Sequence, residues 1–366
     1  MSLKKSFGMA LALLLLLGFA QSALAQFVAV PSGKEPWLKI GGLLQVQADF
    51  GERGDGRFTT GNDRFYLRRA RLNAVGKFLE EFDFKIEIEL SGQLGNNPTI
   101  SSNLRAQMTD GYINWNRYVT ANIKGGQFKT YYGYEQLVLD QKLYTIERSL
   151  VSDRLTLSRQ IGATVYGDLF DKHLSYATGI FNGNGLNNSF NDNDAFLVTG
   201  RVYWLPISRK TPSDMFLGIG VNGFHSKDQD LTQSSDLGLP NVSFTGTRFG
   251  VGVDSQFRWN RFEVWGEYLS ETFEPTVHPT FKDFTADGWH IQLTYFVIPL
   301  KFQVLGKYET FDPTNHLTGD TTNSWIGGFS WFFKGDDICF RVNYYHSQVP
   351  LLDNQDKVLA RFQIIF

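Results

Sequence analysis

The sequence contains 366 residues, with 35 Lys and Arg against 37 Asp and Glu, so its net charge of −2 excludes the basic surplus expected of a nucleic-acid-binding protein. The single cysteine, Cys339, excludes an internal disulfide and a cysteine-based zinc or iron–sulfur site. The chain is at once aromatic and polar, because 15% of its residues are aromatic while its mean hydropathy is only −0.22.

The N-terminus has the pattern of a secretory signal peptide. Two lysines precede an apolar stretch at 7–20, and Ala23-Leu24-Ala25 supplies the small-x-small motif that a signal peptidase recognises. We therefore expect residues 1–25 to be removed and residues 26–366 to form the mature protein. The alternative is an uncleaved anchor, but the apolar stretch is shorter than the roughly 20 residues that a spanning helix needs.

Strict alternation of apolar and polar residues dominates the chain after residue 36. Between residues 82 and 90 the even positions are all apolar and the odd positions are all charged, which is typical of a strand with one apolar face. Counting such segments predicts sixteen strands, at 37–50, 64–78, 82–92, 104–116, 119–128, 159–168, 172–182, 194–204, 215–226, 246–258, 261–272, 286–297, 300–312, 322–333, 337–347 and 356–366.

The connections between these strands alternate between long and short. Short periplasmic turns, long outer loops and an even strand number are the features of a bacterial outer-membrane barrel. Because every backbone polar group must be paired in hydrocarbon, a sheet that spans a bilayer has to close on itself. We therefore predict an all-β fold, a sixteen-stranded antiparallel transmembrane barrel in the outer membrane of a Gram-negative bacterium. A soluble secreted β-protein is the alternative.

No catalytic motif is found in the sequence. The six histidines are scattered without metal-ligand spacing, and the glycine pairs are not followed by helices. We therefore expect no enzyme, no cofactor and no bound metal. An outer-membrane barrel enzyme, whose acid and base come from distant strands, stays open as an alternative.

The long segment after the fifth predicted strand is the first functional candidate. Residues 130–159 mix polar, charged and aromatic side chains, and we expect this loop to fold into the barrel and narrow the pore, with a short helix around 135–143. Its basic residues Arg148, Arg154 and Arg159 are candidate pore-lining groups. The alternative is an exterior loop that caps the barrel.

Basic residues on the water-facing side of the strands are the second candidate. If Ala70 and Leu72 face lipid, then Arg69, Arg71 and Lys77 face the lumen, and Lys124 does so on the fifth strand. We expect Arg69, Arg71, Lys124 and Lys129 to converge at one depth, where a basic ring would attract anions. Carboxylates on the same faces dilute this charge, so a lumen without ion preference is the alternative.

Arg68 conflicts with this register. It falls on the lipid-facing side, where a charge near the bilayer midplane costs roughly 2–4 kcal/mol. A position near the outer rim, or a β-bulge at Arg68-Arg69, would remove the conflict.

A series of short motifs follows in order along most of the first half of the chain, at Phe65–Leu72 (FYLRRARL), Gly126–Thr130 (GQFKT), Gly133–Gln136 (GYEQ), Ile146–Ser149 (IERS), Gly179–Gly183 (GIFNG) and Gly200-Arg201. In order and spacing these motifs resemble the phosphate-selective porins O and P. The second half resembles this family in its strand rhythm and in its terminal Phe366, a feature that outer-membrane barrels use in their assembly signal.

The resemblance implies a homotrimer of barrels, each with its own passive pore. It also implies a lumenal ladder of basic residues that guides phosphate to a constriction, with Arg69, Arg71, Lys124, Lys129 and Arg148 near that site. The expected partners are small anions such as phosphate or polyphosphate, outer-membrane lipid and lipopolysaccharide, and the barrel-assembly machinery through Phe366. A general porin without anion preference is the alternative function.

Overall fold

The computed structural model describes residues 36–52, 54–55, 57–58, 63–91, 106–208, 214–231, 244–276 and 283–366. The expected signal peptide, residues 1–25, lies outside the described residues, as does the whole of the long connection predicted at 93–103. Within the described part of the chain, no helix combines the length and the apolar character that a membrane-spanning helix requires.

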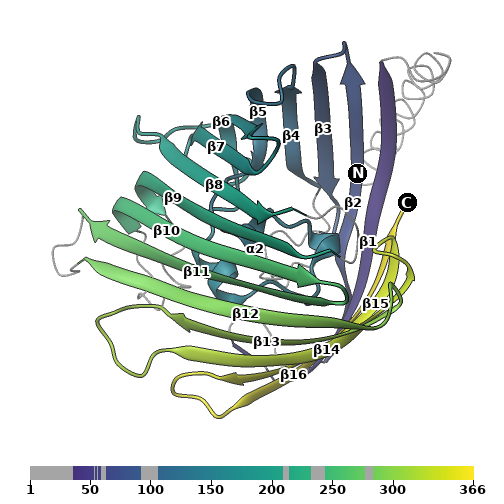
Figure 1. Ribbon diagram of the computed structural model, residues 1–366. Helices are drawn as coiled ribbons and strands as arrows, with labels where there is room; N and C mark the ends of the chain where they lie inside the picture. Colours follow the sequence, from purple (N-terminus) through teal and green to yellow (C-terminus); the bar gives the residue numbers. More distant parts are fainter. Residues whose placement is uncertain are drawn as a thin grey trace, which may run out of the picture.

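Sixteen antiparallel strands form a closed barrel, in which each strand pairs with its neighbours in sequence and β1 also pairs with β16 (Figure 1). The predicted fold class and number of strands are therefore confirmed. The strands are β1 Trp37–Gly51, β2 Arg64–Phe78, β3 Phe82–Glu89, β4 Gln107–Trp115, β5 Asn122–Lys129, β6 Arg159–Leu169, β7 Leu174–Phe181, β8 Leu197–Ile207, β9 Phe216–Leu231, β10 Phe244–Trp259, β11 Phe262–Pro275, β12 Phe284–Ile298, β13 Phe302–Asp312, β14 Thr322–Lys334, β15 Ile338–Gln348 and β16 Gln355–Ile365.

The last residue completes the closure of the barrel. The backbone N–H of Gly42 donates to the carbonyl of Phe366 (2.8 Å), and the N–H of Phe366 donates to the carbonyl of Gly42 (3.1 Å). A side chain on Gly42 would meet the Phe366 ring, because a Cβ there would lie 2.4 Å from its Cζ. The glycine therefore makes room for the terminal aromatic ring on the seam between β1 and β16.

The two faces of the barrel differ in polarity as the alternation predicts. On β1, Gln45, Gln47 and Asp49 are buried toward the interior, whereas Ile40 and Val46 are exposed on the outside. Large aromatic side chains are exposed on the outer face in both halves of the strands, at Trp289 and Trp325 in the half toward the long connections and at Trp204, Trp331 and Phe333 in the other half. This distribution suits a bilayer, where aromatic side chains favour the two interfaces.

The register of β2 explains Arg68. Gln45 of β1 pairs with Arg69 and the next residue, Val46, pairs with Leu67, so Arg68 is an extra residue of β2 between these two pairs. Both Arg68 and Arg69 are buried on the inside as a result. The lipid-facing register expected for Arg68 is therefore wrong, and the β-bulge considered as a solution is present.

The connection between β5 and β6, residues 130–158, is here called the β5–β6 segment. It contains helix α2 (Tyr134–Leu137), the 3₁₀ turn η1 (Asp140–Lys142) and helix α3 (Leu150–Leu155). Helix α2 overlaps the helical region expected around 135–143 and η1 lies within it, whereas the sequence did not indicate α3. Ser149 caps α3, because its side chain accepts a hydrogen bond from the backbone N–H of Ser152.

Apolar side chains of the β5–β6 segment pack against inward-facing residues of distant strands. Leu150, Val151 and Leu155 join a buried cluster with Phe181 on β7 and Phe273 on β11. Ile146 joins a second cluster with Phe58, Leu305, Ile326, Tyr345 and Leu359. Burial of these side chains, at roughly 1.5–3 kcal/mol each, holds the segment against the wall.

Candidate functional site

Asp140 is surrounded by three arginines. Its carboxylate lies 3.2 Å from Nε of Arg69, 2.6 Å from Nη1 of Arg71 and 2.5 Å from Nη1 of Arg148. Burial alone would raise the pKa of Asp140, but Arg69, Arg148 and Arg71 outweigh it and, with Lys129, hold the pKa well below its usual range. Asp140 therefore carries a negative charge at neutral pH and gathers the cations around it.

The end of α2 provides acceptors for two of the basic side chains. Lys129 donates through Nζ to the carbonyls of Gln136 (2.6 Å) and Val138 (3.0 Å). Arg148 donates to the same Val138 carbonyl (2.7 Å) and to the carbonyl of Glu135 (3.2 Å). Carbonyls at the end of a short helix have no partner within the helix, so they are available to hold cations in place.

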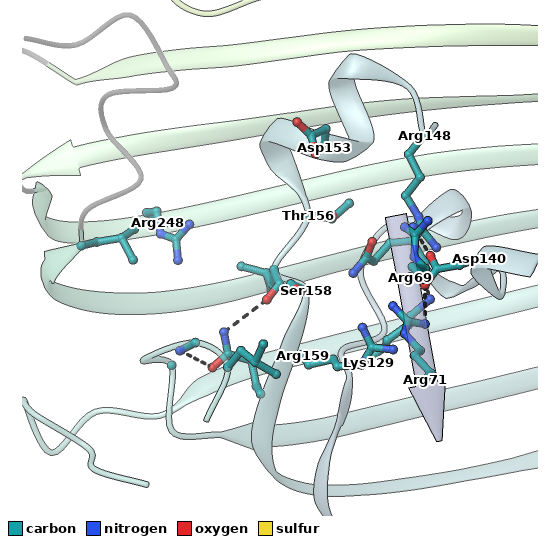
Figure 2. Close-up of a pocket in the computed structure, with 17 residues that line it drawn as sticks. Arg69, Arg71, Lys129, Asp140, Arg148, Asp153, Thr156, Ser158, Arg159 and Arg248 are labelled. Atoms are coloured by element: carbon teal, nitrogen blue, oxygen red, sulfur yellow. Dashed lines mark hydrogen bonds and ion pairs between the residues drawn. The ribbon is translucent and has the colours of Figure 1, made fainter. Parts of the chain in front are cut away.

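A cavity of about 340 Å³ lies beside this cluster (Figure 2). Arg69, Arg71, Lys129 and Arg148 gather around Asp140 on one side, and Arg248 lies apart from them on the opposite side. Six basic and two acidic residues line the cavity, namely Arg69, Arg71, Lys129, Arg148, Arg159 and Arg248 with Asp140 and Asp153. The cavity is therefore positive in formal charge.

A second cavity of about 330 Å³ is lined by five basic and three acidic residues, Arg71, Lys85, Lys124, Lys129 and Arg159 with Glu87, Asp110 and Asp140. Here Lys85 lies 2.6 Å and Arg159 lies 2.7 Å from carboxylate oxygens of Asp110. Lys124 lies over aromatic rings, with Nζ 4.8 Å from the ring centroid of Tyr112. Such a ring face attracts a cation without neutralising its charge.

The two cavities share four residues, Arg71, Lys129, Asp140 and Arg159, which we call the junction. Arg248 of the first cavity lies near the end of β10 that carries the long connection to β9. Lys85 and Lys124 of the second cavity lie near the opposite ends of β3 and β5, where the turns are short. The cavities therefore follow one another along the barrel, with the junction between them.

Another part of the interior is filled by buried ion pairs. Arg68 binds Glu147 at 2.9 Å, and Arg361 of β16 binds the same carboxylate at 2.5 Å. Arg57, from the connection between β1 and β2, pairs with Asp55 and Glu309 and donates to the carbonyl of Arg148 at 2.7 Å. The pairs with Glu147 and the hydrogen bond from Arg57 to Arg148 attach the β5–β6 segment to β2, β16 and the connection between β1 and β2.

Six of the eight basic residues predicted from the sequence line the two cavities, namely Arg69, Arg71, Lys124, Lys129, Arg148 and Arg159. Lys77 lies at the short-turn end of β2 and Arg154 lies on α3, and neither is among the residues that line these cavities.

Of the four residues expected to converge at one depth, Arg71, Lys124 and Lys129 line the second cavity, and Arg69 lines the first. Lys124 stands five positions before Lys129 on β5, which corresponds to roughly 17 Å along a strand.

Sequence reasoning missed several charged residues of the site. Asp140 was one of many charges in a loop, and its position among three arginines depends on η1 and on the bulge in β2. The alternation along the strands places Arg248, Lys85 and Asp110 on the water-facing side of the sheet. Alternation does not show which water-facing residues of different strands meet around one cavity.

The family model for phosphate-selective porins O and P matches residues 40–365. The chain belongs to this porin family. No curated protein matches the sequence. Together with the sixteen-stranded barrel, the family places this porin in the outer membrane as a channel-forming protein.

Several solved structures share this fold at low sequence identity. A loop L8 deletion mutant of OmpT from Vibrio cholerae has 12% identity over 91% of this chain and 100% of its own, with a TM-score of 0.64. The outer-membrane channel DcaP of Acinetobacter baumannii has 13% identity over 90% and 97%, with a TM-score of 0.62. OprB of Pseudomonas putida, with 13% identity over 90% and 94%, has a TM-score of 0.63.

Proposed function

We propose that this porin is a passive diffusion channel that favours small anions, with phosphate as the preferred solute. The observation that carries the proposal is the junction, where three basic residues, Arg71, Lys129 and Arg159, and only one acidic residue, Asp140, line both of two successive cavities. In this proposal the β5–β6 segment narrows the pore, and an anion passes from the cavity near the long loops to the one near the short turns. No cofactor, energy source or chemical step is needed.

Basic groups in a constricted, partly desolvated passage select anions by raising their local concentration. A unit charge about 4 Å from an anion contributes roughly 4 kcal/mol at an effective dielectric near 20, before desolvation. Asp140, the ion pairs of the second cavity and salt screening reduce this preference to roughly several-fold. We therefore expect a moderate anion preference that weakens as the salt concentration rises.

Arginine supports phosphate as the preferred anion. Its planar guanidinium offers paired N–H donors that match phosphate oxygens, and two arginines of the junction face the same passage as Lys129. The family description, phosphate-selective porin, agrees with this assignment.

The reversal potential of single channels in a KCl gradient tests the proposal. We expect the potential to have the sign of chloride permeation, and we expect phosphate at millimolar concentration to reduce the chloride current. A reversal potential of zero without block by phosphate would instead identify a general porin. Hydrolase activity in protein that forms no conducting pore would identify a barrel enzyme.

The proposed functional unit is a homotrimer in which each barrel conducts separately. A trimer form of the Vibrio cholerae protein OmpT supports this proposal through the shared barrel fold, with a TM-score of 0.63 and 10% identity over 91% of this chain and 100% of its own. Three equal conductance steps in one insertion event, together with the mass of the detergent-solubilised complex, test it.

A further inference from the structure

Three ligand-type side chains meet where α2 contacts the barrel wall, away from the two cavities. Glu135 lies on α2, and Glu267 and His290 face each other as a cross-strand pair on β11 and β12. Their carboxylate oxygens and ring nitrogens lie within 4.8 Å of one another, and all three side chains are buried. The triad therefore joins the β5–β6 segment to two strands of the wall.

His290 is the unusual member of this triad. Its side chain is 1% exposed, and neither ring nitrogen has a hydrogen-bond partner among the described residues. A buried imidazole without partners loses the hydrogen bonds that it would make in water, which is costly. Trp265 contacts its ring at a centroid distance of 5.5 Å and holds it edge to face.

The charges around the triad do not balance among the described residues. Lys307 lies 2.8 Å from Glu135 and 3.7 Å from Glu309, and Arg57 pairs with Asp55 and Glu309. Four buried carboxylates, on Asp55, Glu135, Glu267 and Glu309, thus share two basic residues. Asp254, which is also near Glu267, has its own partner in Arg201 at 2.7 Å. Fully ionised, this buried cluster would carry two excess negative charges, which either a bound cation or protons must neutralise.

We propose that Glu135, Glu267 and His290 bind one divalent cation of the zinc class. One imidazole nitrogen with carboxylate oxygens is a ligand set that suits zinc, whereas magnesium and calcium favour oxygen alone. Metal–ligand bonds of about 2.1 Å in tetrahedral geometry place ligand atoms roughly 3.4 Å apart, so the triad contracts slightly on binding.

The neighbouring contacts leave coordination sites available. Glu267 accepts hydrogen bonds from the backbone N–H groups of Tyr134 and Glu135, and a carboxylate has further lone pairs for a metal. Lys307 retains Glu309 as a partner when the metal takes over the charge of Glu135.

The metal would fix α2 to the wall. The carbonyls at the end of α2 hold Lys129 and Arg148, so metal binding at the triad would stabilise the arrangement of the junction without contacting a permeating solute. This role does not depend on which ion the pore selects, and a failure of anion selectivity would leave the metal site untouched.

Elemental analysis of the full chain tests the proposal. The protein is folded in detergent with ZnCl₂, passed through gel filtration to remove loosely bound metal, and analysed beside His290→Gln and Glu267→Gln. We expect about one zinc per wild-type chain, at least a tenfold loss of zinc affinity in each variant, and a higher thermal transition temperature of the wild type with zinc. His346→Ala is the control, because His346 lies outside the triad, is partly exposed and pairs with Asp356 at 2.7 Å.

Three outcomes would overturn the proposal. One is a folded wild-type chain that retains no zinc. Another is folded His290→Gln protein that retains as much zinc as the wild type. The third is a Glu267→Gln barrel that, without metal, is more stable than both the zinc-free and the zinc-loaded wild type. That result would show that protons, and not a metal ion, neutralise the cluster.

Discussion

Arg68 and Glu147 form a two-point ion pair that joins the bulge of β2 to the β5–β6 segment. Nε of Arg68 lies 2.9 Å from one carboxylate oxygen and Nη2 lies 3.0 Å from the other. Because the bulge turns Arg68 inward, the pair exists only in this register of the strand. Burial opposes ionisation of Glu147, but Arg68 and Arg361 hold its pKa well below the usual range.

Glu147→Gln should weaken the attachment of the β5–β6 segment. The variant leaves Arg68 and Arg361 buried without their carboxylate, and breaking a buried pair in this way costs about 3–5 kcal/mol. We expect a lower thermal transition temperature and noisier single-channel currents. Glu81→Gln, which removes a partly exposed partner of Arg117, is the control and should change neither quantity. Quiet currents and an unchanged transition in Glu147→Gln would contradict the assigned role.

The double variant Arg71→Gln, Lys129→Gln should lose most of the anion preference. It removes two positive charges from the junction while glutamine retains a hydrogen-bond donor at each position. We expect the anion-to-cation permeability ratio to fall about threefold or more and the block by phosphate to weaken. Lys77→Gln, on the same strand but outside both cavities, should conduct like the wild type. Equal selectivity of all three proteins would show that the junction does not control permeation.

Asp140 should stabilise the barrel in a pH-dependent way. Arg69, Arg71, Arg148 and Lys129 face this carboxylate and depress its pKa, so its contribution is present above the unfolded pKa of about 4 and is lost as pH falls toward the folded value. We expect Asp140→Asn to be less stable than the wild type at pH 7, and the difference to shrink below about pH 4.

The measurement is the thermal transition of the detergent-solubilised barrel between pH 7 and pH 2.5. Asp171→Asn, in an exposed turn between β6 and β7, should follow the wild-type curve throughout. A stability difference between Asp140→Asn and wild type that stays constant down to the lowest pH would disprove the electrostatic role.

Deletion of Phe366 should reduce the amount of folded barrel in the outer membrane without reducing secretion. The deletion removes both hydrogen bonds between Phe366 and Gly42 at the seam, and it removes the terminal aromatic ring through which we expect recognition by the barrel-assembly machinery. Heat-modifiable migration of membrane fractions measures folding. Replacing the neighbouring Ile365 by Val is the control, and normal folding of the deletion variant would reject both roles.

The sequence predicted the barrel because its information is local. The alternation at 82–90 is enough to assign two faces to a strand, and the same pattern repeated sixteen times, with alternating long and short connections, leaves few folds that satisfy a bilayer. Parity likewise placed Arg69 and Arg71 inside. It failed at Arg68, because a single inserted residue reverses the side on which the neighbouring side chain lies.

What the sequence alone determined was therefore the fold and the set of residues that face water. Only the tertiary structure decided which of them meet, since Asp140 joins arginines 69, 71 and 148, and Glu135 joins residues more than 130 positions away. Contacts of this kind depend on barrel closure and on the path of a loop, and neither follows a repeating pattern along the chain. Which face of a strand a residue occupies is encoded locally in the sequence. Which charged residues of different strands become neighbours is decided only when the sheet closes into a barrel.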